Sequence, residues 1–348
     1  MTKRLFGTTK SGKDAYLFEL KNEKGLRVLA TDFGATLVSV FVKDKDGKER
    51  DIICGYDDLR SYEEHSSYFG ATIGRNGNRI ANSRFSIDGV TYQLDVNDNE
   101  NNLHSGKNGT AFRLWQVKEV SDTKIVFILE DREEDQGFPG TALMEVTYEL
   151  TPLNELKISY YAVCDKKTVF NMTNHAYFNL NGHETGAVYD HLLQIKASHY
   201  TPVSSGKAIP TGEILSVEGT PFDFRQAKPI GRDINADNEQ LRFVNGYDHN
   251  FAIDKTGEGI EDIAYAYSPE SGIEMSVATD CIGVQLYTGN FITGEVGKGG
   301  VTYVKNGAFC LETQFFPNAI NEENFTSPIT EANVPYRTTS VYTFGVKW

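Results

Sequence analysis

The segment ALMEVTYELTPLNELKISYYAV, residues 142–163, decides the fold class of this chain. Apolar and polar residues alternate through 142–150 and again through 156–163, and a short connection containing Pro152 and Asn154 separates the two runs. A period of two is typical of β-strands that bury one face, and proline and asparagine favour turns. The segment therefore predicts two adjacent strands of an antiparallel sheet.

Similar strand signals recur along the whole chain, whereas helical signals are few. Clusters of Gly, Asn, Asp and Pro separate the runs, and segments around Gly47 and Gly272 are typical of hairpin turns. One short helix is expected at 57–65, and proline and glycine interrupt the segment 226–234. We predict an all-β fold, a large antiparallel β-sandwich in which residues 1–348 form a single domain. The other predicted strands are 36–42, 124–130, 191–197, 273–279, 283–289, 308–315 and 340–346.

The charge balance argues against several classes of partner. The chain has 34 basic and 48 acidic residues, which gives a formal net charge of −14 at pH 7. Such a surface repels phosphate backbones and anionic membranes, so we expect no nucleic-acid and no membrane partner. The sequence has no apolar stretch typical of a membrane span or a secretory signal, and its four cysteines lack zinc-site and redox-motif spacing. We therefore expect a cytoplasmic protein with reduced thiols.

One predicted strand places a carboxylate among apolar residues. Within 308–315, alternation puts Glu312 on the same face as Cys310 and Gln314. A glutamate in the middle of a strand either faces solvent or lies in a cavity, and glutamate is rarely buried without a partner. Both interpretations of Glu312 remain open at this level.

A second extended segment combines histidine with aromatic and amide side chains. Within 171–180, His175 shares a face with Tyr177 and Asn179. This combination is more typical of a ligand-binding wall than of an apolar core. A histidine in a strand can equally make structural hydrogen bonds, so the residue type alone does not decide its role.

Three further segments contribute polar candidates. An arginine in the glycine- and asparagine-rich loop 71–81 can offer a fork of donors to hydroxyls or carboxylates, or it can stabilise the loop itself. The segments 101–109 and 246–253 place polar residues in turns, where Asp and Asn are also common for conformational reasons. The candidates in these loops and in the predicted strand 283–289 are Arg75, Asn78, Arg79, His104, Asp248 and Gln285.

Taken together, these segments resemble the aldose 1-epimerase (galactose mutarotase) family over nearly the whole chain. The resemblance implies a galactose mutarotase-like supersandwich and a cofactor-independent isomerase. Its substrates would be the α and β anomers of free hexoses such as galactose and glucose, in the first step of hexose metabolism. The motifs that carry it, in chain order, are GRNGNRI at 74–80, NNLHSG at 101–106, TNHAYFNL at 173–180, GYDHNF at 246–251, GVQLYTGN at 283–290 and LETQFFPNA at 311–319.

The resemblance also implies a role for each candidate except Arg75. Glu312 would be the general base and His175 the general acid, while His104 would bind the sugar and polarise it near its reacting end. If Glu312 and His175 are close, we expect each to stabilise the charged form of the other. No metal or cofactor is implied, the partner is a small aldose, and the protein would be a monomer or a homodimer. The residues implied to bind sugar hydroxyls are Asn78, Arg79, Tyr177, Asp248 and Gln285.

Three other functions remain as alternatives. The first is a metal enzyme in which His104, His175 and Glu312 form a site with two histidines and one carboxylate, although none of these residues are close in sequence. The second is a non-catalytic sugar-binding module, which would not require an acid–base pair. The third is an epimerase for phosphorylated hexoses, which would require a cationic cluster that the acidic composition does not favour.

Overall fold

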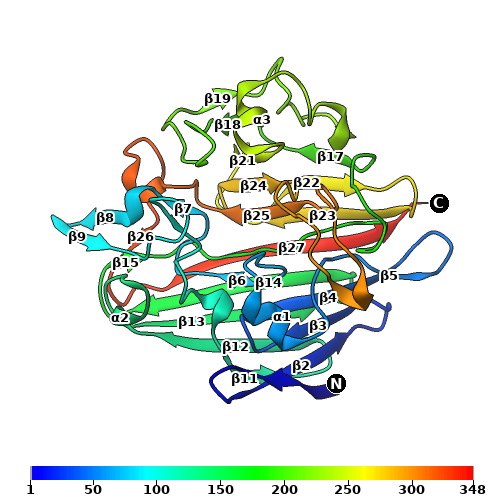
Figure 1. Cartoon of the computed structure of the whole chain (residues 1–348), viewed down its shortest axis with the longest axis horizontal. Helices are drawn as coiled ribbons and strands as arrows, with labels where there is room; N and C mark the ends of the chain where they lie inside the picture. The colour runs from blue at the N-terminus through cyan, green and yellow to red at the C-terminus, as the bar shows by residue number, and fades with distance from the viewer. Residues whose placement is uncertain (1, 348) are drawn as a thin grey trace.

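The computed structural model describes residues 2–347, and its largest feature is an antiparallel sheet of nine strands that crosses the molecule (Figure 1). The segment 142–163 forms two adjacent strands of this sheet, β13 and β14, which pair from Ala142 opposite Cys164 to Leu150 opposite Leu156. The predicted strand pair is thus confirmed. In spatial order the strands are β11 (Gln116–Val120), β12 (Lys124–Asp131), β13 (Ala142–Leu150), β14 (Glu155–Cys164), β27 (Tyr336–Val346), β23 (Ile273–Thr279), β22 (Glu261–Tyr267), β17 (Leu192–Ile195) and β20 (Lys228–Pro229).

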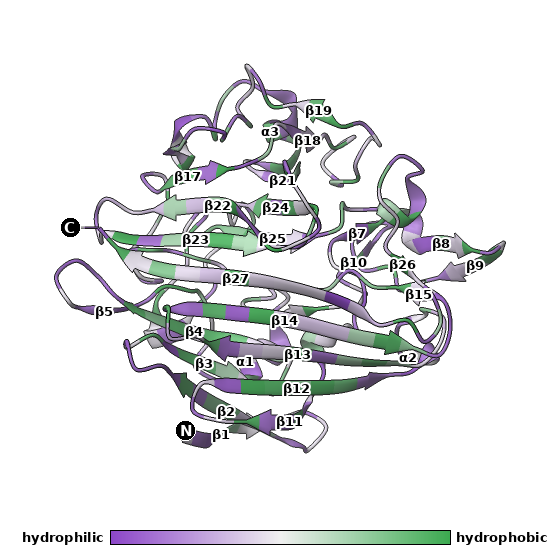
Figure 2. Ribbon diagram, turned by 180° about the vertical axis from the view of Figure 1, so that it is seen from behind, coloured by the Kyte–Doolittle hydropathy of each residue, from purple (hydrophilic) through white to green (hydrophobic). Residues whose placement is uncertain are grey.

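The nine-stranded sheet buries one face and leaves the other partly accessible. Every second residue of β14 is buried, and β13 and β27 show the same alternation. Figure 2 views the molecule from behind, where hydrophilic and hydrophobic residues follow one another along these strands. The period-two pattern of the sequence therefore has its expected cause, because alternate side chains point to opposite faces of the sheet.

Two five-stranded sheets cover the buried face. The main apolar core includes Val40, Val146 and Leu311, which come from one strand of each of the three sheets, so it lies between the large sheet and both smaller ones. The predicted all-β sandwich is confirmed. The first smaller sheet contains β1 (Thr2–Thr8), β2 (Asp14–Lys21), β3 (Arg27–Thr31), β4 (Thr36–Lys43) and β5 (Glu49–Asp51). The second contains β19 (Leu215–Ser216), β18 (His199–Thr201), β21 (Asp248–Ala252), β24 (Gly283–Tyr287) and β25 (Cys310–Gln314).

Four two-stranded sheets extend from this sandwich. The predicted hairpin turn at Gly47 connects β4 and β5, and the glycine has a φ of +77°, which other residues rarely adopt. Two of the small sheets hold loops that reach the site described below. The pairs are β6 (Thr72–Ile73) with β16 (Thr173–Asn174), β7 (Arg79–Ile80) with β10 (Asn102–Leu103), β8 (Arg84–Ile87) with β9 (Val90–Gln93), and β15 (Thr168–Val169) with β26 (Ile329–Thr330).

Helices are short. The predicted helix at 57–65 is α1 (Leu59–Glu64), whose first turn is capped by the Asp58 carboxylate. The interrupted segment 226–234 forms β20 and a single 3₁₀ turn. Helix α3 (Glu239–Val244) was not predicted, although Asn238 caps it. Helix α2 (Glu133–Gln136) is a single turn. No helix within residues 2–347 has the length and apolar composition needed to cross a membrane.

Candidate active site

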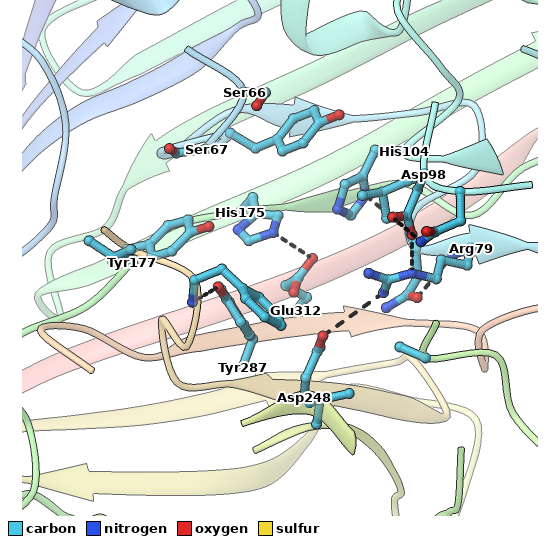
Figure 3. A pocket seen from close by; sticks show the side chains of 18 of the residues that line it. Ser66, Ser67, Arg79, Asp98, His104, His175, Tyr177, Asp248, Tyr287 and Glu312 are labelled. Carbon is cyan, nitrogen blue, oxygen red and sulfur yellow. Dashed lines mark hydrogen bonds and ion pairs between the residues drawn. The ribbon is translucent and has the colours of Figure 1, made fainter. Parts of the chain in front are cut away.

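A cavity of about 450 Å³ brings together side chains from distant parts of the chain (Figure 3). Its wall includes every site residue expected from the sequence except Gln285. Beneath it lies a second apolar cluster that includes Val38, Cys54 and Cys310, on the side of β4 and β25 that faces away from the main core. The cavity therefore has a rigid base and a polar wall. The predicted residues in its wall are Asn78, Arg79, His104, His175, Tyr177, Asp248 and Glu312.

Glu312 enters the cavity from β25. Its neighbours Leu311 and Thr313 face the large sheet, where the Tyr342 hydroxyl donates to the Leu311 carbonyl oxygen and the Thr313 hydroxyl lies 2.6 Å from the Ser340 hydroxyl. Alternation along the strand then turns Glu312 into the cavity. Its side chain is 3% exposed, and the Oε2 atom has no hydrogen-bond partner among the described residues. The solvent-facing interpretation of Glu312 is therefore wrong.

His175 lies beside Glu312 because two backbone contacts hold its segment. The His175 N–H donates to the Ala71 carbonyl oxygen at 3.0 Å, and the His175 carbonyl oxygen accepts from the Gly70 N–H at 2.9 Å. Gly70 has a φ of +65°, and a Cβ atom there would lie 1.9 Å from the Leu37 carbonyl oxygen, so this close approach requires glycine. The His175 Nε2 atom is consequently 3.7 Å from Glu312 Oε2.

Two further groups touch the imidazole ring of His175. Tyr177 stacks on it, with ring centroids 4.9 Å apart and an angle of 17° between the planes. The Cys310 Sγ atom lies 3.6 Å from Nδ1. These contacts leave Nε2 directed toward Glu312 (Figure 3).

Burial opposes the charges of both groups. Loss of solvation raises the pKa of Glu312 well above its usual value, and the nearby Asp248 raises it further. The same effect lowers the pKa of His175 to about 4. Desolvation is therefore the largest influence on the pKa of each group, and it favours the neutral form of both; the mutual stabilisation of their charged forms stays a prediction. A single proton held by the pair resides on Glu312.

Asn78 determines the hydrogen-bonding state of His104. Strands β7 and β10 pair, so the two residues are adjacent, and both have left-handed backbone conformations with φ of +60° and +53°. The Asn78 N–H donates to His104 Nδ1 at 3.1 Å. Burial lowers the pKa of His104 well below its usual value, so its ring is neutral. A neutral imidazole that accepts at Nδ1 carries its proton on Nε2, so His104 is a hydrogen-bond donor at that atom.

A chain of charged and amide groups forms the opposite part of the wall. Arg79 Nε donates to Asp98 Oδ2 at 2.7 Å, and Arg79 Nη1 lies 3.9 Å from Asp248 Oδ2. The Gln285 side-chain amide donates to Asp248 Oδ1 at 2.7 Å. Burial raises the pKa of Asp248, and Arg79 opposes this shift. Gln285 lies outside the wall and orients the Asp248 carboxylate through this hydrogen bond; its contact with the sugar stays a prediction.

Arg75 lies outside the cavity, although it comes from the same loop as Arg79. Its guanidinium is completely buried and donates to the Asp131 carboxylate at 2.5 Å and to the carbonyl oxygens of Pro139 and Gly140. Of the two interpretations that the sequence left open, the structural one holds for Arg75. Arg75 therefore points into the core, whereas Arg79 points toward the cavity.

Comparison with known proteins identifies the family. A family model described as aldose 1-epimerase matches residues 16–343. Aldose 1-epimerase from Escherichia coli (strain K12) is 39% identical over 317 residues, with 91% of each chain covered. Galactose mutarotase from Sus scrofa is 37% identical over 348 residues, with 99% of each chain covered. A crystal structure of an aldose epimerase homologue from C. elegans superposes with a TM-score of 0.89 at 33% identity, covering 95% of this chain and 99% of that one.

The chain belongs to the aldose 1-epimerase family.

Its activity is that of an aldose 1-epimerase, an isomerase that interconverts the two anomers of an aldose. The alternative of a non-catalytic sugar-binding module has no support from this family. The features that relate the chain to its family are the same ones that line the cavity, since the matched region contains every motif quoted from the sequence.

The epimerase cavity also contains residues that the sequence analysis did not single out for a role. Tyr68 packs its ring edge-on against His104 at 4.7 Å, and burial raises the pKa of its hydroxyl to about 12. Asp98 pairs with Arg79, as described above. These residues lie in loops, where no periodic pattern marks a side chain that faces a site. The further lining residues without an expected role include Ser66, Ser67, Phe291 and Glu295 in loops and Tyr287 at the end of β24.

Proposed function

We propose that this epimerase acts on free hexoses such as galactose and glucose, with Glu312 as general base and His175 as general acid. The observation that carries the proposal is the placement of a carboxylate and an imidazole 3.7 Å apart in a buried polar cavity. Galactose is suggested by the galactose mutarotases among the relatives. Opening a sugar ring requires removal of a proton from the C1 hydroxyl and delivery of a proton to the ring oxygen, which one base and one acid accomplish.

The two steps of the reaction follow from these roles. Glu312 takes the C1 hydroxyl proton while His175 supplies a proton to the ring oxygen, and the C1–O bond of the ring breaks to give the open aldehyde. The C1–C2 bond then rotates by about half a turn. In the reverse step the ring oxygen attacks the other face of C1, Glu312 returns its proton to the new hydroxyl, and His175 regains its own. Both residues end in their starting states.

Ring opening requires the active proton arrangement, with Glu312 ionised and His175 protonated. This arrangement contains the same single proton as the one that burial favours, so only its position within the pair must change. Sugar hydroxyls that donate to Glu312 favour its charged form. The Nε2–H of His104 is a donor for an oxygen near C1, which supports its role in polarising the substrate.

The remaining predicted residues are suited to bind the sugar hydroxyls that lie away from C1. Asp248 and the guanidinium of Arg79 can accept from and donate to neighbouring hydroxyls, and Asn78 adds an amide. The ring of Tyr177 supplies an apolar surface beside His175. We assign Gln285 a positioning role through its hydrogen bond to Asp248.

Polarimetry tests the catalytic assignment. The purified chain should accelerate the anomerisation of α-D-galactose and α-D-glucose, and Glu312→Gln or His175→Asn should each lower that acceleration by about 10²–10⁴. The exposed residues Glu323 and His199 provide matched controls, since Glu323→Gln and His199→Asn make the same chemical changes outside the cavity. Near-full activity in either cavity variant, with circular dichroism unchanged, would disprove the assigned role.

A metal-dependent reaction is the second candidate. Ligand atoms of His104, His175 and Glu312 all lie within 4.8 Å of one another, so the structure brings together the three residues that the sequence keeps far apart. The hydrogen bond from Asn78 opposes this candidate. A histidine that binds a metal usually donates its other ring N–H to an acceptor, whereas His104 Nδ1 accepts from a backbone N–H and Nε2 keeps its proton.

Three further properties are proposed: the domain organisation, the cellular location and the oligomeric state. We propose that residues 1–348 act as a single domain, because the nine-stranded sheet takes strands from both halves of the chain and pairs β14 with β27. We further propose a cytoplasmic location, which the four unpaired cysteines support. We also propose that the protein is a monomer or a homodimer. Sedimentation equilibrium measures the mass in solution, and masses above a dimer would contradict the expected assembly.

A further inference from the structure

The charged groups around the cavity are unevenly balanced. Arg79 is the only lysine or arginine among the described residues that line it. Burial keeps His104 and His175 from contributing positive charge. The wall therefore holds more acidic than basic side chains. Its carboxyl groups belong to Asp98, Asp248, Glu295 and Glu312, and burial favours the neutral form of Glu312.

The positive charge of Arg79 is already compensated. Its Nε–H donates to Asp98 Oδ2 at 2.7 Å, and its Nη1 atom lies 3.9 Å from Asp248 Oδ2, so the guanidinium lies between two carboxyl groups (Figure 3). Binding of a phosphate or carboxylate relies on a cation whose charge is still available. An anionic sugar at this position would meet a paired arginine and two carboxyl groups.

Asp98 is held in the wall by its own loop. The Asp98 N–H donates to the Asn101 carbonyl oxygen at 3.1 Å, and the Asn101 N–H donates to the Asp98 carbonyl oxygen at 2.9 Å. The Asn99 side-chain amide lies 3.3 Å from Asp98 Oδ1, and the Asp98 side chain is 23% exposed. Its carboxylate is therefore a fixed part of the wall.

Glu295 adds a carboxylate on another part of the wall. Its Oε1 atom accepts from the Ser67 hydroxyl at 2.6 Å, while Oε2 is buried without a hydrogen-bond partner among the described residues. The Glu295 carbonyl oxygen accepts from the Tyr303 N–H at 2.9 Å, which anchors the residue at the base of a short hairpin. No lysine or arginine forms an ion pair with this carboxylate in the described part of the chain.

We propose that Asp98 and Glu295 make this site selective for uncharged aldoses by repelling sugars that carry a carboxylate or a phosphate. The inference rests on the proposed function, because it takes this cavity as the sugar site. Repulsion between like charges at a distance of one sugar ring in a partly buried site changes affinity by about tenfold for each charge. Dissolved salt weakens it at Asp98, whose side chain retains access to water.

D-Galactose and D-galacturonate test the proposal, because they differ at C6, where the second sugar carries a carboxylate. The ratio of their kcat/KM values for anomerisation at pH 7 is measured for the wild-type chain, Asp98→Asn and Glu295→Gln. Asparagine and glutamine keep an oxygen that accepts from Arg79 or Ser67 while removing the charge. Glu100→Gln is the matched control, since Glu100 lies in the same loop as Asp98 but pairs with Lys207 at the exposed surface.

We expect the wild-type chain to prefer galactose by at least about tenfold, and this preference to weaken as salt is added. Asp98→Asn and Glu295→Gln should each lower the ratio of kcat/KM for galactose to kcat/KM for galacturonate several-fold, whereas Glu100→Gln should leave this ratio unchanged. Narrowing in one variant alone assigns the selectivity to that residue. The proposal is wrong if both variants keep the wild-type ratio, if galactose and galacturonate react equally well in the wild-type chain, or if the control narrows the ratio as much.

A binding measurement separates this outcome from failure of the catalytic assignment. Calorimetric titration of the Glu312→Gln chain with both sugars reports selectivity without turnover, and Asp98→Asn in that background should narrow the ratio of their dissociation constants. If Glu312→Gln remains active, the assigned base is wrong while the selectivity is still judged by this ratio. If neither sugar binds, the cavity is not the sugar site and the selectivity proposal falls with it.

Discussion

Glu312 and His175 are held together in a cavity that disfavours the charge of each. Because they are coupled, their protons are best counted for the pair. With one proton the pair can supply both a base and an acid. With two protons Glu312 cannot act as a base, and with none His175 cannot act as an acid.

The proton count predicts how activity depends on pH. As pH falls through about 4, His175 becomes protonated while Glu312 is already protonated, so kcat/KM should fall. As pH rises through the pKa of Glu312, which burial places well above its usual value, the pair loses its last proton and kcat/KM should fall again. A bell-shaped profile of kcat/KM against pH, corrected for spontaneous anomerisation, checks this. A profile without an alkaline limb would contradict the assignment of the proton to Glu312.

Asp248 affects both sugar binding and the pKa of Glu312. Asp248→Asn removes a charged acceptor, and we expect KM for galactose to rise by about tenfold or more, because hydrogen bonds to charged groups contribute about 1.5–3 kcal/mol. The negative charge of Asp248 raises the pKa of Glu312, so its removal should also move the alkaline limb to lower pH. Steady-state kinetics across pH measures both effects. A lower kcat with KM and the limb unchanged would refute the binding role.

At the scale of elements, the loop that precedes β7 serves two purposes. Arg75 fastens it to the core through Asp131, and Arg79 extends from β7 into the cavity. The sequence presents both arginines in the same glycine- and asparagine-rich context, so residue type alone does not separate them. The separation comes from Asp131 on β12, which provides a buried carboxylate that only one of the two can reach.

The buried pair makes Arg75 a stability residue. Arg75→Leu leaves buried carbonyl oxygens and part of the Asp131 carboxylate without donors, so we expect the free energy of unfolding to fall by about 3–5 kcal/mol. Urea denaturation followed by circular dichroism measures the change. Arg60→Leu on α1 is the control, because Arg60 is exposed and its ion pair with Glu64 should contribute little. Equal effects of the two substitutions would show that burial of the Arg75 pair does not stabilise the fold.

Elements with a regular pattern were the predictable ones. Strands β13 and β23 have the bounds expected from alternation, since a strand with one buried face must alternate. Helix α3 was missed although Asn238 caps its first turn and Asn245 ends it in a left-handed conformation. Loop residues such as Tyr68 and Asp98 belong to no period and were not predicted.

At the scale of the whole molecule, the sandwich brings together three groups that a metal ion could use. The cofactor-independent reaction predicts that dialysis against EDTA leaves the rate of galactose anomerisation unchanged, within the scatter of untreated samples. A spectroscopic assay for bound metal on the same sample provides the control. Loss of activity on chelation, with recovery on adding Zn²⁺ or another divalent ion, would favour the metal-dependent candidate.

The all-β class, most long strands and seven of the residues that line the cavity could be predicted from the sequence alone. Alternation is a local property of an extended backbone, and motifs are local strings, so both can be read without knowing the fold. Only the tertiary structure decided that Glu312 faces a cavity, that Gln285 stands behind Asp248 and that Asn78 orients His104. Burial in the folded chain also favours the neutral forms of Glu312 and His175, whereas the roles of base and acid need their charged forms. Burial and contacts between distant segments set these properties, and neither is encoded in any short stretch of the chain.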